Sequence, residues 1–453
     1  MLPIIAHLDM NSYFASVEQQ DNFAWRGRPV GVCEHLGGIL IAASREAKLW
    51  GIGTGTPVWE AKKIYPKILL THTHPQRYRL YHDRFVKLVS DYTDRVEAYS
   101  IDEVFIDLTK ACNIRAEAKS LKLERPATNL NFVSVNPYQE AVKIVLEIKR
   151  RMKKEVGDWL TVSAGVAPTK LLAKIGSDMQ KPDGLTLVTS LKVQVQSYKA
   201  EYNILQYSTE ELYSVLKLTD IPGIGERQEK RLNVLGIRTL IDLRNYPESK
   251  LVAQFGILGK HLHSMGQLEG SWQPNVYQSQ DIKSIGHAYT VPKEFREKKF
   301  FAPVLYKLSE MVARRLRAQK LAGSTLHFYL HSGDGIFFGK SKRLGYFVED
   351  GREIFLESLK IYEQLALNEG PAKFVTFKFV GVTVSGLSNI TGQQSLFEQD
   401  GRVKRAVAAL DIINKKYGDF TICRVPVSQA GGIFQDSIGF GRIKERVRLA
   451  SFS

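Results

Sequence analysis

The stretch Val96–Leu108, VEAYSIDEVFIDL, constrains the fold of this chain more than any other. Apolar and aromatic residues alternate with small ones as in a β-strand, yet Asp102 and Glu103 stand side by side in its middle. Adjacent carboxylates repel one another, and burying a charge without a partner is costly. The fold must therefore bring positive charge to this strand. Taken alone, the pair is explained better by Lys or Arg partners on the protein surface than by a bound cation.

Asp9 is the candidate third carboxylate, because it ends the apolar strand Ile4–Met10, where an acid is otherwise poorly placed. Two core strands that each end in acids can bring three carboxylates to one sheet edge. Hard divalent cations such as Mg²⁺ take oxygen ligands and are commonly shared with substrate phosphates. A two-metal site would neutralise the acids and polarise both oxygens of a phosphoryl transfer.

Length and charge narrow the class of protein. The 453 residues predict roughly two to four domains. Lys and Arg total 63 against 47 acids, a net charge of +16, which favours a nucleic-acid partner over an ordinary basic protein. No apolar run reaches about 18 residues, and the N-terminus lacks signal-peptide features, so no membrane partner is expected. Cys33, Cys112 and Cys423 have no metal-like spacing, which fits reduced thiols and a cytoplasmic location.

The order of expected elements divides the chain. Strands alternate with helices over the first part, which predicts an α/β or α+β core. Cys112–Pro137 lacks clear periodicity and is expected to be an insertion or a long loop. From about Ser208, the next stretch of the sequence is expected to be mainly helical. A β-α-β-β-α-β unit follows; its expected elements are Ser284–Val291, Phe301–Leu321, Ser324–Leu330, Ile336–Leu344, Phe347–Ala366 and Phe374–Ser385.

Five quoted stretches carry a family resemblance. LDMNSYFASVE and YSIDEVFIDL resemble the two palm motifs of the Y-family translesion DNA polymerases, in particular the bacterial polymerase IV and UmuC-like branch. GVAPTKLLAKIGSDMQKPDG resembles a third family motif, DIPGIGERQEKRLNVLGI the helix-hairpin-helix of the thumb, and KSIGHAYTV the start of the little finger. The resemblance runs from about Leu2 to Phe397, with Cys112–Pro137 as the main unmatched insert.

The resemblance implies an α+β, multidomain fold, a right-hand polymerase with palm, small fingers, helix-hairpin-helix thumb and a β-α-β-β-α-β little finger. The implied ranges are 1–12 and 78–188 for the palm, 13–77 for the fingers, 189–272 for the thumb, 273–283 for a linker, 284–390 for the little finger, and 391–453 for a clamp-binding motif and C-terminal tail.

The resemblance also implies the catalytic residues. Asp9, Asp102 and Glu103 are expected to carry two Mg²⁺ ions, with Mn²⁺ as a substitute, and the main-chain carbonyl of Met10 is a further ligand. Phe14 aligns with the steric gate, a flat ring beneath the incoming sugar that leaves no room for a 2′-hydroxyl.

Further residues of the same motifs are expected to bind the nucleotide. Lys174 aligns with the lysine that reaches the triphosphate, and Tyr13 is expected to present its backbone N–H near the phosphates. Lys48 takes the place of a second basic phosphate ligand, where the family more commonly has arginine; the UmuC-like branch shares its EAK. Arg45 stands where a tyrosine is common. It either contacts phosphate or the nascent base pair, or is a solvated charge.

DNA contacts are expected in two places. IPGIG followed by a helix leaves backbone N–H groups free at a helix start, a ready phosphate site, although an ordinary helical corner would look similar. Its residues are Gly223, Gly225, Arg227, Lys230 and Arg231. The little finger adds a basic surface made of Arg314, Arg315, Arg317, Lys320, Lys340, Lys342 and Arg343.

GQQSLF, Gly392–Phe397, is similar to the bacterial sliding-clamp peptide. Leu396 and Phe397 would fill an apolar pocket of the β clamp, while Gln393 would hydrogen-bond its rim. The UmuC-like EAK also raises UmuD-like accessory subunits as partners, besides primer-template DNA and dNTP.

The sequence therefore predicts a template-directed DNA polymerase of low fidelity that performs translesion synthesis during DNA repair and damage tolerance. No exonuclease-like motif accompanies the acids, so proofreading is not expected. Two alternatives are a catalytically silent DNA- and clamp-binding scaffold and another palm-type nucleotidyl enzyme such as a nucleotide cyclase. The lesion range and the preferred nucleotide stay open.

Overall fold

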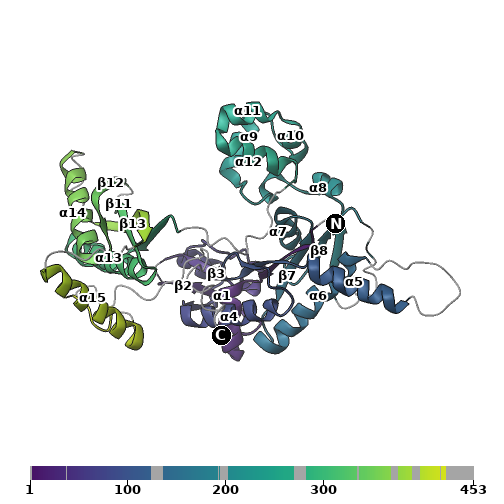
Figure 1. Ribbon diagram of the computed structural model, residues 1–453, viewed down its shortest axis with the longest axis horizontal. Helices are drawn as coiled ribbons and strands as arrows, with labels where there is room; N and C mark the ends of the chain where they lie inside the picture. Colours follow the sequence, from purple (N-terminus) through teal and green to yellow (C-terminus); the bar gives the residue numbers. More distant parts are fainter. Residues whose placement is uncertain are drawn as a thin grey trace. The chain divides into compact units, whose positions relative to one another are not determined.

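The computed structural model shows two compact units, one within Met1–Gln278 and one within Ser279–Ser437, and each is described by itself (Figure 1). The described residues are 3–36, 38–123, 136–191, 193, 202–269, 282–333, 336–368, 376–389, 398–418 and 420–424.

A six-stranded sheet, here the central sheet, organises the first unit. Its order is β5-β6-β1-β7-β8-β9, so β1 lies between β6 and β7 and is antiparallel to both. The strands are β1 (Ile5–Met10), β5 (Val96–Ala98), β6 (Glu103–Asp107), β7 (Val162–Ala167), β8 (Leu185–Val188) and β9 (Ile204–Tyr207). All six residues of β1 are buried, which explains why that stretch is apolar except for His7 and Asp9.

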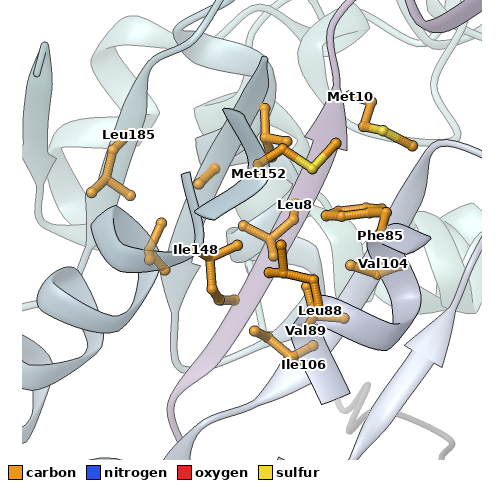
Figure 2. Packing of buried hydrophobic residues seen from close by; sticks show 14 of the residues in the cluster. Leu8, Met10, Phe85, Leu88, Val89, Val104, Ile106, Ile148, Met152 and Leu185 are labelled. Atoms are coloured by element: carbon orange, nitrogen blue, oxygen red, sulfur yellow. The ribbon is translucent and has the colours of Figure 1, made fainter. Parts of the chain in front are cut away.

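Helices α4 (Pro75–Ser90) and α6 (Pro137–Arg151) cover one face of the central sheet. Figure 2 shows Leu8 of β1 within a cluster that includes Phe85 and Ile148, contributed by these two helices. A short π-helical turn, η2 (Met152–Val156), extends α6 and adds Met152 to the same core. This packing buries β1 and β6, the strands that carry Asp9 and Glu103.

Helix α7 (Lys170–Met179) covers the opposite face. Thr169 caps its start, because the Thr169 hydroxyl accepts a hydrogen bond from the Leu172 amide. Gly165 of β7 allows α7 to lie very close, since a Cβ at this position would fall 1.9 Å from the Ala173 carbonyl oxygen. This close approach determines how far the side chains of α7 lie from the central sheet.

A smaller sheet, order β3-β2-β4, and three helices lie between β1 and α4 in the chain. Its elements are α1 (Tyr13–Asp21), η1 (Phe23–Trp25), β2 (Val30–Cys33), β3 (Leu40–Ala43), α2 (Arg45–Leu49), α3 (Val58–Ile64) and β4 (Leu69–His72). It has a small core of its own, in which Leu40 and Ile52 are fully buried.

A helical segment completes the first unit. It comprises α8 (Thr209–Val215), η4 (Leu218–Asp220), α9 (Glu226–Val234), α10 (Leu240–Asn245), α11 (Glu248–Phe255) and α12 (Ile257–Gly266). Its buried leucines belong to the same apolar cluster as Ile5, Phe105 and Leu172 on the α7 face of the central sheet.

The second unit confirms the expected β-α-β-β-α-β order. Its sheet has the order β10-β13-β11-β12, and α13 and α14 share its core. The elements are β10 (Ser284–Thr290), η5 (Lys293–Phe295), η6 (Lys298–Phe300), α13 (Phe301–Ala318), β11 (Leu321–Ser332), β12 (Phe337–Val348), α14 (Gly351–Asn368) and β13 (Phe377–Asn389).

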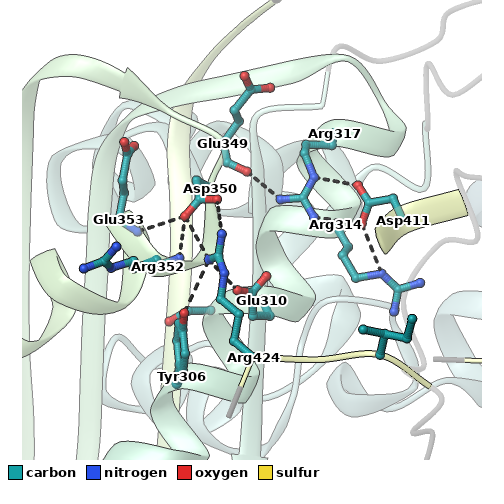
Figure 3. A network of polar contacts seen from close by, with 12 residues as sticks. Tyr306, Glu310, Arg314, Arg317, Glu349, Asp350, Arg352, Glu353, Asp411 and Arg424 are labelled. Carbon is teal, nitrogen blue, oxygen red and sulfur yellow. Dashed lines mark hydrogen bonds and ion pairs between the residues drawn. The ribbon is translucent and has the colours of Figure 1, made fainter. Parts of the chain in front are cut away.

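Helix α15 (Glu398–Tyr417) and the residues up to Arg424 pack on α13 (Figure 3). Both Nε and Nη2 of Arg317 donate to the Asp411 carboxylate, at 2.7 and 2.9 Å. Arg424 donates to Glu310 at 2.9 Å and to both carboxylate oxygens of Asp350 at 2.9 and 3.1 Å. Helix α15 and residues 420–424 therefore form an additional layer of the second unit.

Four expectations about local structure were wrong. Val96–Leu108 is not one strand, because β5 and β6 pair antiparallel and Glu103 starts β6, directly after Asp102. Cys112–Pro137 is not a loop from its start, because α5 (Thr109–Leu123) runs through its first half; residues 124–135 lie outside the described part. Phe347 belongs to β12, and α14 starts at Gly351, where the Asp350 carboxylate accepts from the next amides. Helix α13 ends at Ala318, and Leu321 already starts β11. In each case a cap or a strand partner decided a boundary that periodicity left open.

Candidate active site

Three carboxylates meet where β1 and β6 lie side by side. The register places Asp9 directly opposite Glu103. Asp102 precedes β6, and its carbonyl oxygen accepts a hydrogen bond from the Met10 amide at 2.9 Å. Asp9 is 6 % exposed, while the other two acids are half-buried. The structure thus brings together the three acids that the sequence singled out.

Lysines from the α7 segment neutralise two of these acids. Lys174 Nζ lies 2.9 Å from Glu103 Oε2. Lys181 Nζ lies 2.8 Å from Asp9 Oδ2 and 2.7 Å from Asp178 Oδ1. Lys181 was not singled out from the sequence, although it stands in the quoted MQKPDG; only the fold shows that it reaches Asp9.

The acids differ in their affinity for protons. Burial raises the pKa of Asp9 to about 7, against the opposing charge of Lys181. Burial also raises the pKa of Asp102, although the Ser100 hydroxyl donates to it at 2.6 Å. For Glu103, burial is outweighed by the His7 imidazole and the Lys174 ammonium, which bring its pKa to about 2. Asp9 and Asp102 therefore resist ionisation in a site that concentrates negative charge.

The donor set suits a hard divalent cation, because all three side chains offer carboxylate oxygens. Within the described residues, no group of three or more His, Cys, Asp or Glu side chains is already gathered to hold a metal ion. Instead, Asp9 and Glu103 each hold a lysine ammonium, a cation in direct contact with the carboxylate. Asp107 lies at the other end of β6, opposite Ile5, and pairs with Arg95 at 2.9 Å.

Helix α1, which follows β1 in the chain, carries two buried aromatic rings. Phe14 is 2 % exposed and stacks on Tyr78 of α4, with ring centroids 4.3 Å apart and an interplanar angle of 18°. Tyr13 is also buried, and its hydroxyl donates to the Tyr78 carbonyl oxygen. The Tyr13 ring is therefore fixed within the core.

Helix α2 carries the two cations expected to bind the nucleotide. Partial desolvation and the nearby Lys181 ammonium lower the pKa of Lys48, while Asp9 and Asp102 oppose the shift. Lys48 is thus within electrostatic reach of the acids. Arg45 is half-buried and donates from Nη2 to the Trp159 carbonyl oxygen at 3.3 Å.

The expected DNA contacts of the helical segment lie at the start of α9. Gly223 has φ +103°, a conformation that favours glycine, and Gly225 is the N-cap residue of α9. The α9 cations, Arg227, Lys230 and Arg231, are exposed. Buried Ile221 and Ile224 fix the turn from inside.

The cations of the second unit fall into two groups. On α13, Arg314 and Arg317 face Asp411, and Arg315 donates to the Gly286 carbonyl oxygen at 3.3 Å. On β12, Lys340 and Arg343 are exposed, whereas Lys342 pairs with Glu357 at 2.7 Å; Lys320, after α13, is also exposed. The clamp-motif residues Gln393, Leu396 and Phe397 lie outside the described part of the chain.

Comparisons with known proteins agree with this geometry. Family models match residues 8–178 (impB/mucB/samB family), 282–396 (the C-terminal domain of that family) and 219–267 (DNA polymerase-iota, thumb domain). The DNA polymerase IV proteins of Pelotomaculum thermopropionicum and Moorella thermoacetica are each 30 % identical over 435 residues, covering 95 % of this chain and 97 % of the relative. A solved Y-family DNA polymerase chimera shares the fold, with a TM-score of 0.66 at 22 % identity over 85 % of this chain and 99 % of its own.

The fold and the relatives define a DNA-directed DNA polymerase of the right-hand type. The chain belongs to the Y family of DNA polymerases, the translesion class, and DNA polymerase IV proteins are among its relatives. Enzymes of this family act on primer-template DNA and dNTPs with divalent metal ions. This membership decides against a nucleotide cyclase and against a catalytically silent scaffold. The helices in the described part of the chain include none long and apolar enough to cross a bilayer.

Proposed function

We propose that Asp9, Asp102 and Glu103, with the Met10 carbonyl, hold two Mg²⁺ ions, or Mn²⁺ in their place, for dNTP addition to a primer 3′-hydroxyl. The observation that carries this proposal is the register of β1 and β6, which sets Asp9 opposite Glu103 with Asp102 next to it. The bound ions would supply charge stabilisation at the attacking and leaving oxygens. Asp9 and Glu103 each contact a lysine ammonium, which supports the proposal that these carboxylates bind cations.

The surrounding residues are proposed to hold the nucleotide. Lys174 of α7 contacts Glu103, and the charges of Asp9 and Asp102 act on Lys48 of α2, so both lysines are proposed to bind the triphosphate. Phe14 is proposed as the steric gate, with Tyr13 supplying its backbone N–H. Arg45 donates a hydrogen bond to the Trp159 carbonyl oxygen, and its role in the choice of nucleotide is left open.

DNA and protein partners are proposed from the remaining cations and motifs. The α9 start (Gly223, Gly225, Arg227, Lys230) would bind a phosphate backbone without reading sequence. In the second unit, the exposed Lys340 and Arg343 are better placed for DNA than the α13 arginines, which are engaged internally. A β clamp at Gln393, Leu396 and Phe397, UmuD-like subunits and a cytoplasmic location are proposed from the sequence alone.

The domain ranges that the family resemblance implied are proposed here unchanged. We propose 1–12 and 78–188 as palm, which includes most of the central sheet, 13–77 as fingers and 189–272 as thumb. The little finger is proposed as 284–390, joined by the linker 273–283 and followed by the tail 391–453.

Primer extension with Mg²⁺ and dNTPs on undamaged and abasic templates tests the site. We expect the wild type to extend both templates and the Asp102→Ala/Glu103→Ala double variant to extend neither, while still binding primer-template. Equal extension by both proteins would refute the assignment of the acids. The same assay with added β clamp should stimulate the wild type but not a Leu396→Ala/Phe397→Ala variant, which must keep its basal extension.

A further inference from the structure

One buried polar atom lies beside the acids without a hydrogen-bond partner: Nε2 of His7. His7 is two residues before Asp9 on β1, on the same face of the strand, and is 0 % exposed. Its Nε2 lies 3.5 Å from Glu103 Oε2, slightly beyond a hydrogen bond. Buried polar groups are nearly always paired, so an unpaired one aimed at a catalytic acid calls for an explanation.

The surroundings of His7 fix the direction of its ring. Nδ1 lies 2.7 Å from the Ser177 hydroxyl of α7, and the ring centroid lies 4.4 Å from that of Phe105, the residue opposite on β6. With Nδ1 held by Ser177 and one face against Phe105, Nε2 points at Glu103. A closure of about 0.5 Å would complete the bond.

The placement of the protons follows from the partners. A buried neutral imidazole has one N–H, and when the Ser177 hydroxyl donates to Nδ1 that N–H is on Nε2, facing the carboxylate. The Ser177 hydroxyl has a second acceptor, the Lys174 carbonyl oxygen at 2.8 Å. If it donates there, a lone pair of Nε2 faces Glu103 instead, which is repulsive. The first arrangement is therefore the one that agrees with a carboxylate at this distance.

We propose that His7 is a positioning residue for Glu103, whose carboxylate it holds through Nε2–H while the nucleotide is bound. At present Lys174 holds Glu103 through the same oxygen, Oε2, at 2.9 Å. When the Lys174 ammonium binds a triphosphate instead, Oε2 of Glu103 loses its hydrogen-bond donor. The Nε2–H of His7 then takes the place of that donor. The inference rests on the carboxylate site proposed above and adds a residue that orients it.

Two amide variants separate the two ring nitrogens. In His7→Gln the amide nitrogen stands near the place of Nε2, and in His7→Asn near the place of Nδ1. Gln therefore keeps a donor toward Glu103, whereas Asn keeps a partner only for Ser177. Ile5→Ala is the control for packing, because Ile5 is buried on the same face of β1 and does not reach the acids.

Mn²⁺ binding, followed by the electron paramagnetic resonance of free Mn²⁺, provides a readout that needs no turnover. The full chain is titrated with a dideoxy-terminated primer-template and the next dNTP present. We expect His7→Asn to bind Mn²⁺ about 10- to 100-fold more weakly, His7→Gln to stay within a few-fold of wild type, and Ile5→Ala to bind as wild type. Thermal melting compares the folding of all variants.

The outcomes distinguish this inference from the site itself. Wild-type affinity in His7→Asn, or equal weakening in His7→Asn and His7→Gln, overturns the role of Nε2–H. Equal weakening in Ile5→Ala shows a packing effect and also overturns it. Glu103→Ala tests the site: if it binds Mn²⁺ as wild type does, the proposed carboxylate site fails, whatever the His7 variants show.

Discussion

At the residue scale, two of the three acids that lie where β1 ends and β6 starts are paired with lysines. Lys181 pairs with Asp9, and Lys174 pairs with Glu103. Isolated acids at this burial would repel one another and take up protons, as the pKa of about 7 for Asp9 already indicates. Lys174 therefore contacts a carboxylate here, and we propose that it also binds the triphosphate.

Phe14 is the residue whose side chain is expected to select the sugar. Phe14→Ala removes the ring, so we expect discrimination between dNTP and rNTP to fall by at least about tenfold, measured as the ratio of kcat/KM values. Tyr78→Phe is the matched control, because it keeps the stacked ring and removes only the hydroxyl that donates to Glu18 at 2.6 Å. Unchanged discrimination in Phe14→Ala would contradict the gate.

At the element scale, α7 determines the site as much as the strands do. It carries Lys174 and Ser177, and Lys181 follows just after it. All three act at the sheet because α7 packs against β7 at Gly165, where backbone approaches backbone. A substitution at Gly165, which is remote in sequence from the acids, should therefore alter the catalytic activity.

Gly165→Ala places a Cβ 1.9 Å from the Ala173 carbonyl oxygen and 2.5 Å from the Ser177 amide nitrogen, so α7 must shift. We expect a loss of about 1–3 kcal/mol in the free energy of unfolding, measured with denaturant, and a raised KM for dNTP because Lys174 moves. Gly53→Ala is the control, since a Cβ there has open space. Full stability in Gly165→Ala would refute the close packing.

At the scale of the whole molecule, two units with separate cores should unfold separately. The second unit includes the layer formed by α15 and Arg424, which the motifs did not explain. Arg424 binds Glu310 and Asp350 with its side chain 25 % exposed, so the contact is partly shielded from solvent (Figure 3). This layer should therefore stabilise one unit and leave the other unchanged.

Arg424→Ala is expected to lower the stability of the second unit by about 1–3 kcal/mol at pH 7. Burial raises the pKa of Asp350, but the Arg424 hydrogen bonds outweigh it and bring that pKa below 3.8. A lowered carboxyl pKa gives stability that is present above the ordinary value and lost as the pH falls through the lowered one. Burial raises the pKa of Glu310, and the positive charge of Arg424 opposes that shift.

Calorimetry at several pH values checks this prediction. One of at least two transitions should shift in Arg424→Ala, and the shift should shrink as the pH falls below about 4. Arg402→Ala, at an exposed position of α15, is the control and should leave both transitions in place. A shift of every transition, or one that does not depend on pH, would contradict a local ion pair.

Local patterns and motifs within the sequence determined the class of this protein, the α+β fold and the order of the second unit. Asp9, Asp102, Glu103 and Lys174 stand in short motifs, and apolar periodicity marks the buried strands. Helix and strand ends were less well predicted, because caps such as Asp350 and strand pairing at Phe347 decide them.

Only the tertiary structure decided which polar side chains pair. Asp9 pairs with Lys181, 172 positions later in the sequence, and His7 contacts Ser177, 170 positions later. Such pairs depend on the packing of α7 against the sheet, and neither periodicity nor spacing encodes that distance. The fold thus accommodates the two adjacent acids separately: Lys174 of α7 contacts Glu103 at the start of β6, and the Ser100 hydroxyl donates to Asp102 just before that strand.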